Sequence, residues 1–207
     1  MTFRRRLAVL AASSLLLAGC AVPGQPAAPG VALQSEGETV TTADLDAVAA
    51  AWEADSDGAI MPGRRAIATA TLLGPGLLEV AASNDAVINE GVARTFAEAW
   101  LEFAGVENPE PSDAVVESTE NVLALYVATY ADTNGTILRD AVDSLPEDVA
   151  ISPRLGALSA DALVASAQAA VGNAEVAGLG NYSFTAFLDV SGFESTSADW
   201  AVTEGGE

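Results

Sequence analysis

The chain has 207 residues and a formal net charge of −21, with no histidine and a single cysteine. The negative charge excludes nucleic acid as a ligand, because phosphate binding requires a cationic surface. Without histidine, the commonest general base and metal ligand is missing, so we expect no enzymatic activity, no metal site and no cofactor. A lone cysteine cannot form an intramolecular disulfide, so the fold must depend on packing.

The amino terminus has the layout of a secretory signal. A positive segment, Arg4–Arg6, precedes the apolar stretch LAVLAASSLLLA, which is followed by Gly19 and Cys20. This stretch is shorter than the ~20 residues that a helix needs to cross a bilayer. It is therefore predicted to be a cleaved leader rather than a permanent anchor.

Leu17, Ala18, Gly19 and Cys20 resemble the lipobox of bacterial lipoproteins, in which the cysteine is acylated and becomes the first mature residue. The resemblance implies that residues 1–19 are a signal peptide and that Cys20 carries a lipid. It also implies a position at the outer face of the cytoplasmic membrane. The alternative is a soluble secreted protein with an incidental cysteine.

Removal of the leader makes the chain still more acidic, because it takes away three of the eight cations and none of the 29 acidic residues, leaving a net charge of −24. Residues 20–30 consist of the cysteine and a segment rich in proline, alanine and glycine. They predict an extended tether of about 30 Å at ~3 Å per residue.

The folded part begins with a hairpin signal over residues 31–40, followed by a helix. Thr41 or Thr42 can cap this helix, with Asp44 completing an approximate capping box. An apolar stripe at helical spacing is formed by Leu45, Val48, Ala49 and Trp52. The pattern predicts a helix that packs on others.

Four further helices are predicted before residue 146. The second begins at Pro62 and is broken or kinked by the Gly-Pro-Gly sequence at residues 74–76. The third extends from about Asn84 to Phe103, the fourth is capped by Ser112, and the fifth lies near residues 135–145.

The sequence DVAISPRLG, which follows Pro146, predicts a short strand that ends at Pro153 and returns to pair with the hairpin. One more helix is expected over residues 160–171, opened by Ser159 and stopped by Gly172. Much of the chain from residue 173 onward is expected to be weakly ordered around the apolar island FTAFLDV. The predicted fold is mainly α, with five to six helices, a small hairpin and a returning strand.

Two segments have some of the spacing of a calcium-binding loop. In EADSDGAI, residues 53–60, acidic side chains occupy the first, third and fifth positions, but Arg64 replaces the glutamate at the twelfth. The related ADTNGTI, residues 131–137, lacks acidic groups at both end positions. Both segments fit helix termination better than metal binding.

The order of the hairpin, the capped helix with Thr42, Asp44 and Leu45, and the later Ser-Pro-Arg-Leu-Gly segment resembles the amino-terminal domain of the SurA and PrsA class of extracytoplasmic chaperones. The shorter lipoproteins of high-GC Gram-positive bacteria are the most similar. In that segment, the residues that match the end of the family's returning strand are Ser152, Pro153, Arg154 and Gly156. The resemblance covers residues 31–156 and implies binding of unfolded polypeptides.

Residues 157–207 are too few for the parvulin prolyl isomerase domain of longer family members, and they are predicted to add a helix and an acidic, partly disordered tail. The leading hypothesis is therefore a lipid-anchored, chaperone-like protein that holds unfolded or extended exported polypeptides in an apolar crevice between helices, without isomerase activity. Acidic groups around the crevice would favour hydrophobic and basic clients. The alternatives are an accessory envelope lipoprotein that docks one folded partner and a small-molecule-binding lipoprotein.

Overall fold

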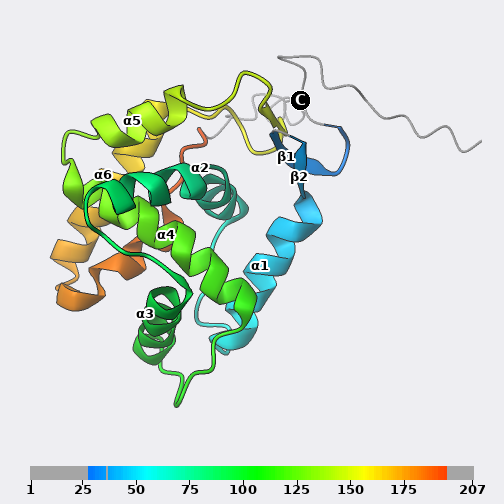
Figure 1. Ribbon diagram of the computed structural model, residues 1–207. Helices are drawn as coiled ribbons and strands as arrows, with labels where there is room; N and C mark the ends of the chain where they lie inside the picture. Colours follow the sequence, from blue (N-terminus) through cyan, green and yellow to red (C-terminus); the bar gives the residue numbers. More distant parts are fainter. Residues whose placement is uncertain (1–27, 36, 195–207) are drawn as a thin grey trace, which may run out of the picture.

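The computed structural model describes residues 28–35 and 37–194. These residues form six α-helices, a 3₁₀-helix and a small antiparallel sheet (Figure 1), which confirms the mainly helical fold predicted from the sequence. In chain order the elements are β1 (Val31–Ser35), β2 (Glu38–Thr41), α1 (Thr42–Asp55), α2 (Arg64–Ser83), α3 (Glu90–Phe103), α4 (Asp113–Ala131), α5 (Thr136–Asp143), β3 (Ala150–Ile151), α6 (Ala160–Val176) and η1 (Gly180–Asp189).

The sheet has the strand order β2-β1-β3, so the hairpin's first strand lies between its partner and the strand that returns after α5. Leu33 pairs with Ile151, and the backbone N–H of Ser152 donates to the carbonyl of Ala32 at 2.8 Å. The predicted return of the strand before Pro153 is confirmed. The five helices α1 to α5 therefore lie, along the chain, between the hairpin and the third strand of the same sheet.

Helix α1 begins with the predicted capping box. Thr41 Oγ1 accepts a hydrogen bond from the backbone N–H of Asp44 at 3.1 Å, and Asp44 Oδ2 accepts one from the backbone N–H of Thr41 at 2.7 Å. Two amides that the first turn would leave unpaired are thus satisfied. Leu45 and Trp52 from the predicted stripe are buried.

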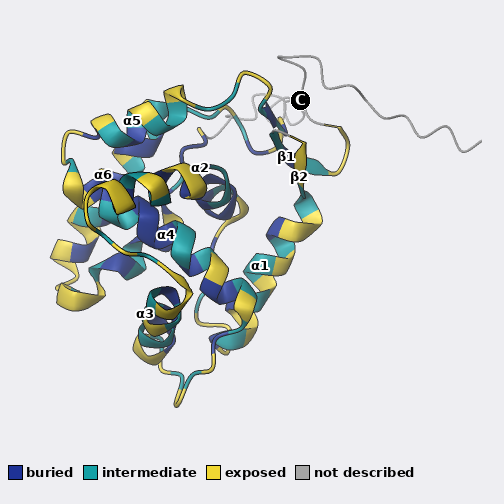
Figure 2. Ribbon diagram, in the orientation of Figure 1, coloured by how far each residue is buried: buried dark blue, intermediate teal, exposed yellow. Residues whose placement is uncertain are grey.

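Helix α4 passes through the middle of the molecule and is buried over most of its length (Figure 2). Trp52 of α1 reaches it, because its indole N–H donates to Ser118 Oγ at 3.1 Å. The same indole packs edge-on against Trp100 of α3, with 5.2 Å between ring centroids. Three helices therefore meet at this aromatic contact.

Helix α2 differs from its prediction at its start, and of the break or kink predicted at its centre it shows no break. It begins at Arg64, after Gly63 rather than at Pro62, and it continues unbroken through Pro75. A proline inside a helix costs about 3 kcal/mol. Leu73 and Leu77, on either side of it, are fully buried in the core, and this burial offsets the cost of the proline.

The close approach of α2 to α4 depends on Gly74. A β-carbon at this position would lie 2.1 Å from Asn121 Oδ1 and 2.7 Å from Asn121 Cβ. The clash with Cβ cannot be relieved by rotating the asparagine side chain. Gly76, one residue beyond the proline, is exposed and has no atom within 4 Å of the corresponding position.

Of the next three helices, α4 and α5 agree with their predicted positions and α3 does not. Helix α4 follows Ser112, although the Ser112 hydroxyl makes no capping hydrogen bond, and α5 lies inside the predicted range. Helix α3 begins at Glu90 rather than near Asn84, because Asn84 ends α2 and the side chain of Asn89 caps α3 by accepting from the N–H of Val92 at 3.0 Å.

The expectation of a weakly ordered chain after residue 173 is wrong for residues 173–194. Helix α6 continues through Gly172, and η1 follows it. Phe184 and Phe187 of η1 are buried in the same cluster as Trp100, so residues 157–194 share the core of residues 31–156. The glycine and serine content of this segment predicted little structure. The segment is instead stabilised by burial of its aromatic side chains against distant parts of the chain, which local composition does not show. Residues 195–207 lie outside the described part of the chain.

Asp132 connects α4 to α5. Its carboxylate accepts hydrogen bonds from the backbone N–H groups of Asn134 at 3.0 Å and of Ile137 at 3.1 Å, and also from that of Thr136. These donors, that of Ile137 foremost, lower the pKa of the Asp132 carboxyl. The second calcium-like segment is thus a helix-capping turn.

We expect Gly74→Ala to destabilise the protein and Gly76→Ala to stabilise it. The first substitution overpacks the contact between α2 and α4, at a cost of about 1–3 kcal/mol. The second places a better helix former in an open position, with a gain of about 0.5–1 kcal/mol. Urea unfolding followed by circular dichroism measures both, and equal effects of the two alanines would contradict the proposed role of Gly74.

We expect Asp132→Asn to reduce the free energy of unfolding at neutral pH by more than it does at pH 2. A carboxyl with a lowered folded pKa contributes stability above its unfolded pKa of about 4 and loses that contribution as the pH falls through its folded value. The free energies of unfolding of wild type and variant are measured by urea unfolding from pH 2 to 7 and subtracted at each pH. The subtraction removes the pH dependence that both proteins share because of their acidic surface. A difference independent of pH would contradict this role.

Candidate functional site

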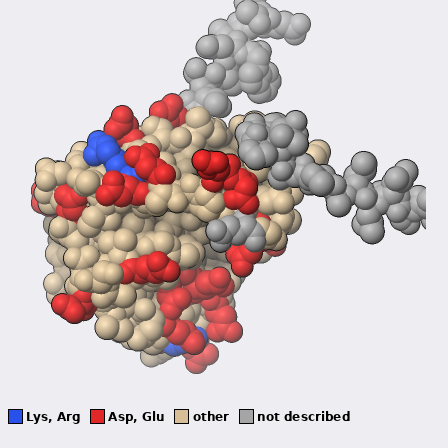
Figure 3. Space-filling model, turned by 45° about the horizontal axis from the view of Figure 1, so that its top comes forward, with Lys and Arg blue, Asp and Glu red and all other residues tan. Residues whose placement is uncertain are grey.

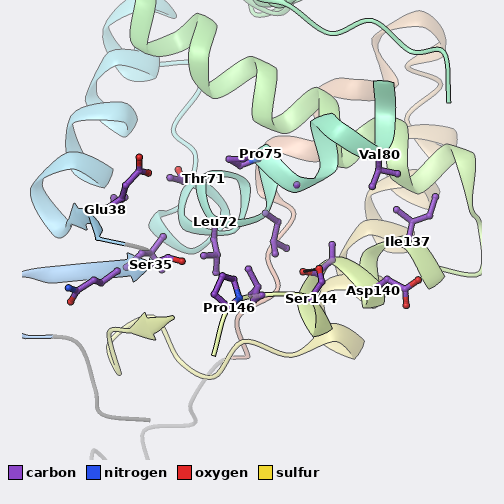
Figure 4. A pocket seen from close by; sticks show the side chains of 17 residues that line it. Ser35, Glu38, Thr71, Leu72, Pro75, Val80, Ile137, Asp140, Ser144 and Pro146 are labelled. Atoms are coloured by element: carbon purple, nitrogen blue, oxygen red, sulfur yellow. Dashed lines mark hydrogen bonds between the residues drawn. The ribbon is translucent and has the colours of Figure 1, made fainter. Parts of the chain in front are cut away.

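A hollow lies between the hairpin, α2 and α5 (Figure 4), and we call it the main groove. Its volume is about 780 Å³, and it is partly open to solvent. It is lined by Leu33, Gln34, Ser35, Glu38, Val40, Thr71, Leu72, Leu73, Pro75, Gly76, Val80, Ile137, Asp140, Ala141, Ser144, Leu145 and Pro146.

The lining is apolar at the centre and polar towards the edges. Leu72 and Pro75 of α2 lie in the middle of the groove (Figure 4), with Val80 farther along the same helix. Hydroxyl groups come from opposite walls, Ser35 from the hairpin and Ser144 from the end of α5. Such a surface can hold apolar side chains while offering hydrogen bonds at its margins.

The Gly-Pro-Gly sequence explains why a hollow forms beside α2. Gly76, which lines the groove, has no side chain to fill the space and is open on its exposed side. Pro75 has no amide hydrogen, so it cannot donate to the carbonyl of Thr71, its partner in a regular helix. Thr71 lines the groove together with Pro75.

A second hollow, the side pocket, lies between α1, α2, α4 and the edge of β2, and has a volume of about 320 Å³. It is lined by Thr39, Val40, Asp44, Leu45, Val48, Ala70, Thr71, Ala114, Glu117, Ser118 and Asn121. Val40 and Thr71 also line the main groove, so the two hollows adjoin each other on either side of these residues.

Every charged side chain among the described residues that line either hollow is acidic: Glu38, Asp44, Glu117 and Asp140. Carboxylates are spread over the face seen in Figure 3, where arginine side chains are few. Among the described residues, Arg64, Arg94 and Arg139 form ion pairs with neighbouring carboxylates. The hollows therefore have a negative potential that the protein's own cations do not balance.

The residues predicted to carry the lipid, Cys20 with Leu17, Ala18 and Gly19, lie outside the described residues. The described chain starts at residue 28, within the predicted tether, and enters the sheet at Val31.

The first calcium-like segment forms the end of α1. Ser56 is the carboxyl-terminal cap, and Asp57 and Gly58 adopt left-handed conformations with φ of 53° and 83°. The N–H of Gly58 donates to the carbonyl of Glu53 at 2.7 Å, as in a helix-terminating turn. Within residues 28–35 and 37–194, no group of three or more acidic or cysteine side chains is placed to hold a metal ion.

Among the described residues, α2 is the one helix that is long and apolar enough to cross a membrane by composition alone. Half of its apolar window is buried within the protein. Its buried face packs against α4, which is the environment of a core helix.

Sequence reasoning anticipated an apolar crevice with acidic margins but did not locate it. The Gly-Pro-Gly sequence was the available signal, since a run without bulky side chains in an otherwise apolar helix leaves space beside it. That signal was interpreted as a helix break. The walls contributed by the hairpin and α5 could not be assigned, because they come from segments about 100 residues apart in the chain.

Comparisons with protein-family models, with curated proteins and with solved structures find no match to this chain. What the groove binds must therefore be inferred from its own shape, residues and charges.

Proposed function

We propose that this protein is a lipid-anchored, chaperone-like binding protein that holds unfolded or extended exported polypeptides at the outer face of the cytoplasmic membrane, without prolyl isomerase activity. The observation that carries the proposal is the main groove, a partly open, apolar-centred hollow of about 780 Å³ with acidic edges. Exposed apolar surface with a polar rim is typical of sites that bind other polypeptides.

The groove suits an extended chain in two respects. Its central residues, Leu72 and Val80 among them, can accept apolar side chains that a folded client would bury. The hydroxyls of Ser35 and Ser144 can pair with the client's backbone, whose amides in an unfolded segment have no intramolecular partners. A groove that recognises only the backbone and the apolar side chains of a client can bind many different sequences.

The arrangement of elements also supports this proposal. The hairpin, the threonine-capped helix and the strand that returns before Pro153 occur in the order that resembles the amino-terminal domain of SurA and PrsA chaperones. In this chain, the hairpin supplies one wall of the main groove, and the loop before the returning strand contributes Pro146.

The volume of the main groove favours a second candidate, a small-molecule-binding lipoprotein. Small-molecule sites occupy about 300–1,000 Å³ and bury most of the ligand surface. The groove falls within this range but is partly open, so a small ligand would remain exposed on one side. We therefore place polypeptide binding first.

We expect the purified protein to slow the aggregation of a chemically denatured client, and Val80→Asp to weaken this effect. Val80 lines the groove. An apolar side chain bound there would remove water from the new carboxylate, which is unfavourable. Loss of one valine contact corresponds to about a tenfold weaker affinity. Light scattering during dilution of the client from denaturant measures the effect.

Val87→Asp is the matched control. Val87 is 72% exposed and lines neither hollow, yet the substitution changes the net charge equally. It should leave the activity at the wild-type level. If wild-type protein in stoichiometric excess fails to slow aggregation of any client, or if the two aspartates act alike, the groove is not a polypeptide-holding site.

We expect Cys20→Ala to release the protein from the membrane fraction of cells. Without the thiol no lipid can be attached, and the remaining acidic chain is repelled by anionic headgroups. Fractionation and immunoblotting of cells that express either form measure this. Retention of the alanine variant in the membrane fraction would show that another feature anchors the protein.

A further inference from the structure

The side pocket adjoins the main groove, and its chemistry differs from that of the groove. Val40 and Thr71 line both, so a chain that lies in the groove can reach the pocket without leaving the surface. Successive residues of an extended chain advance by about 3.3 Å, and alternate side chains point to the same side. Different side chains of one client can therefore occupy the two hollows together.

Two carboxylates border the side pocket. Glu117 of α4 is exposed and has no ion-pair partner among the described residues. Asp44 Oδ2 accepts hydrogen bonds from the backbone N–H and the hydroxyl of Thr41, which leaves Oδ1 available. The Thr41 hydroxyl and backbone N–H lower the pKa of Asp44, so this group is ionised at neutral pH.

The remaining lining provides an apolar wall and further acceptors. Leu45, Val48 and Ala70 can contact the methylene stem of a long side chain. Ser118 Oγ accepts one hydrogen bond from Trp52 and keeps a second lone pair. A lysine or arginine side chain has an apolar stem that ends in a cation. It therefore matches a pocket with an apolar wall and carboxylates at its edge.

We propose that the side pocket is a subsite for a lysine or arginine side chain of the same extended polypeptide whose apolar residues occupy the main groove. This inference rests on the proposed function and assigns the client a pattern: an apolar cluster with a neighbouring cation. No arginine of the protein lines either hollow in the described chain, so the client supplies the positive charge.

The test uses three synthetic peptides with one apolar core and a single variable position, occupied by Lys, Gln or Glu. Their dissociation constants for the purified protein are measured by fluorescence anisotropy. We expect the Lys peptide to bind about two- to fivefold more tightly than the Gln peptide, as for an exposed ion pair. Glu117→Gln should lower this preference, because it removes one of the two carboxylates of the side pocket.

Glu120→Gln is the matched control, because Glu120 lies on the same helix, lines neither hollow and carries the same charge. It should retain the preference for lysine. If both glutamine variants lower the preference equally, net charge explains it and the subsite is overturned. If the Lys and Gln peptides bind wild type equally, the subsite also fails while the groove remains. If no peptide binds, the proposed function itself fails.

Discussion

The close packing of α2 on α4 determines where both hollows lie. Gly74 allows Asn121 to approach the backbone of α2, and Leu73 and Leu77 are buried beside this contact. With one side of α2 held against the core, the residues at Pro75 and Gly76 are left on the outside of the helix. The main groove then forms where the hairpin and α5 flank this outer side without covering it.

The fold is stabilised by its core, because its charges are overwhelmingly of one sign. The ion pairs of Arg64, Arg94 and Arg139 join exposed groups, and exposed pairs contribute at most about 1 kcal/mol each. In the core, Trp100 lies between Trp52 and Phe184, with ring centroids 5.2 and 5.0 Å away. This cluster joins α1, α3 and η1. The carboxyl-terminal segment therefore helps to stabilise the two earlier helices.

The same charge imbalance unites the proposed functions. Carboxylates keep the folded part away from anionic lipid, while a lipid at Cys20 would hold the protein at the membrane through an extended tether. An apolar groove with acidic margins attracts chains that carry both exposed apolar residues and cations. A negative surface would also discourage self-association through the groove, because two copies repel each other.

The sequence by itself determined the features that depend on neighbouring residues: the capping box of Thr41 and Asp44, the start of α4 after Ser112, the helical class and the sign of the surface charge. Only the tertiary structure decided the outcomes that depend on distant contacts. Burial of Leu73 and Leu77 kept α2 intact through Pro75, and burial of the phenylalanines of η1 ordered a segment whose glycines and serines predicted the opposite. The groove belongs to this second group, because a hollow exists only once its walls, distant in sequence, have packed together.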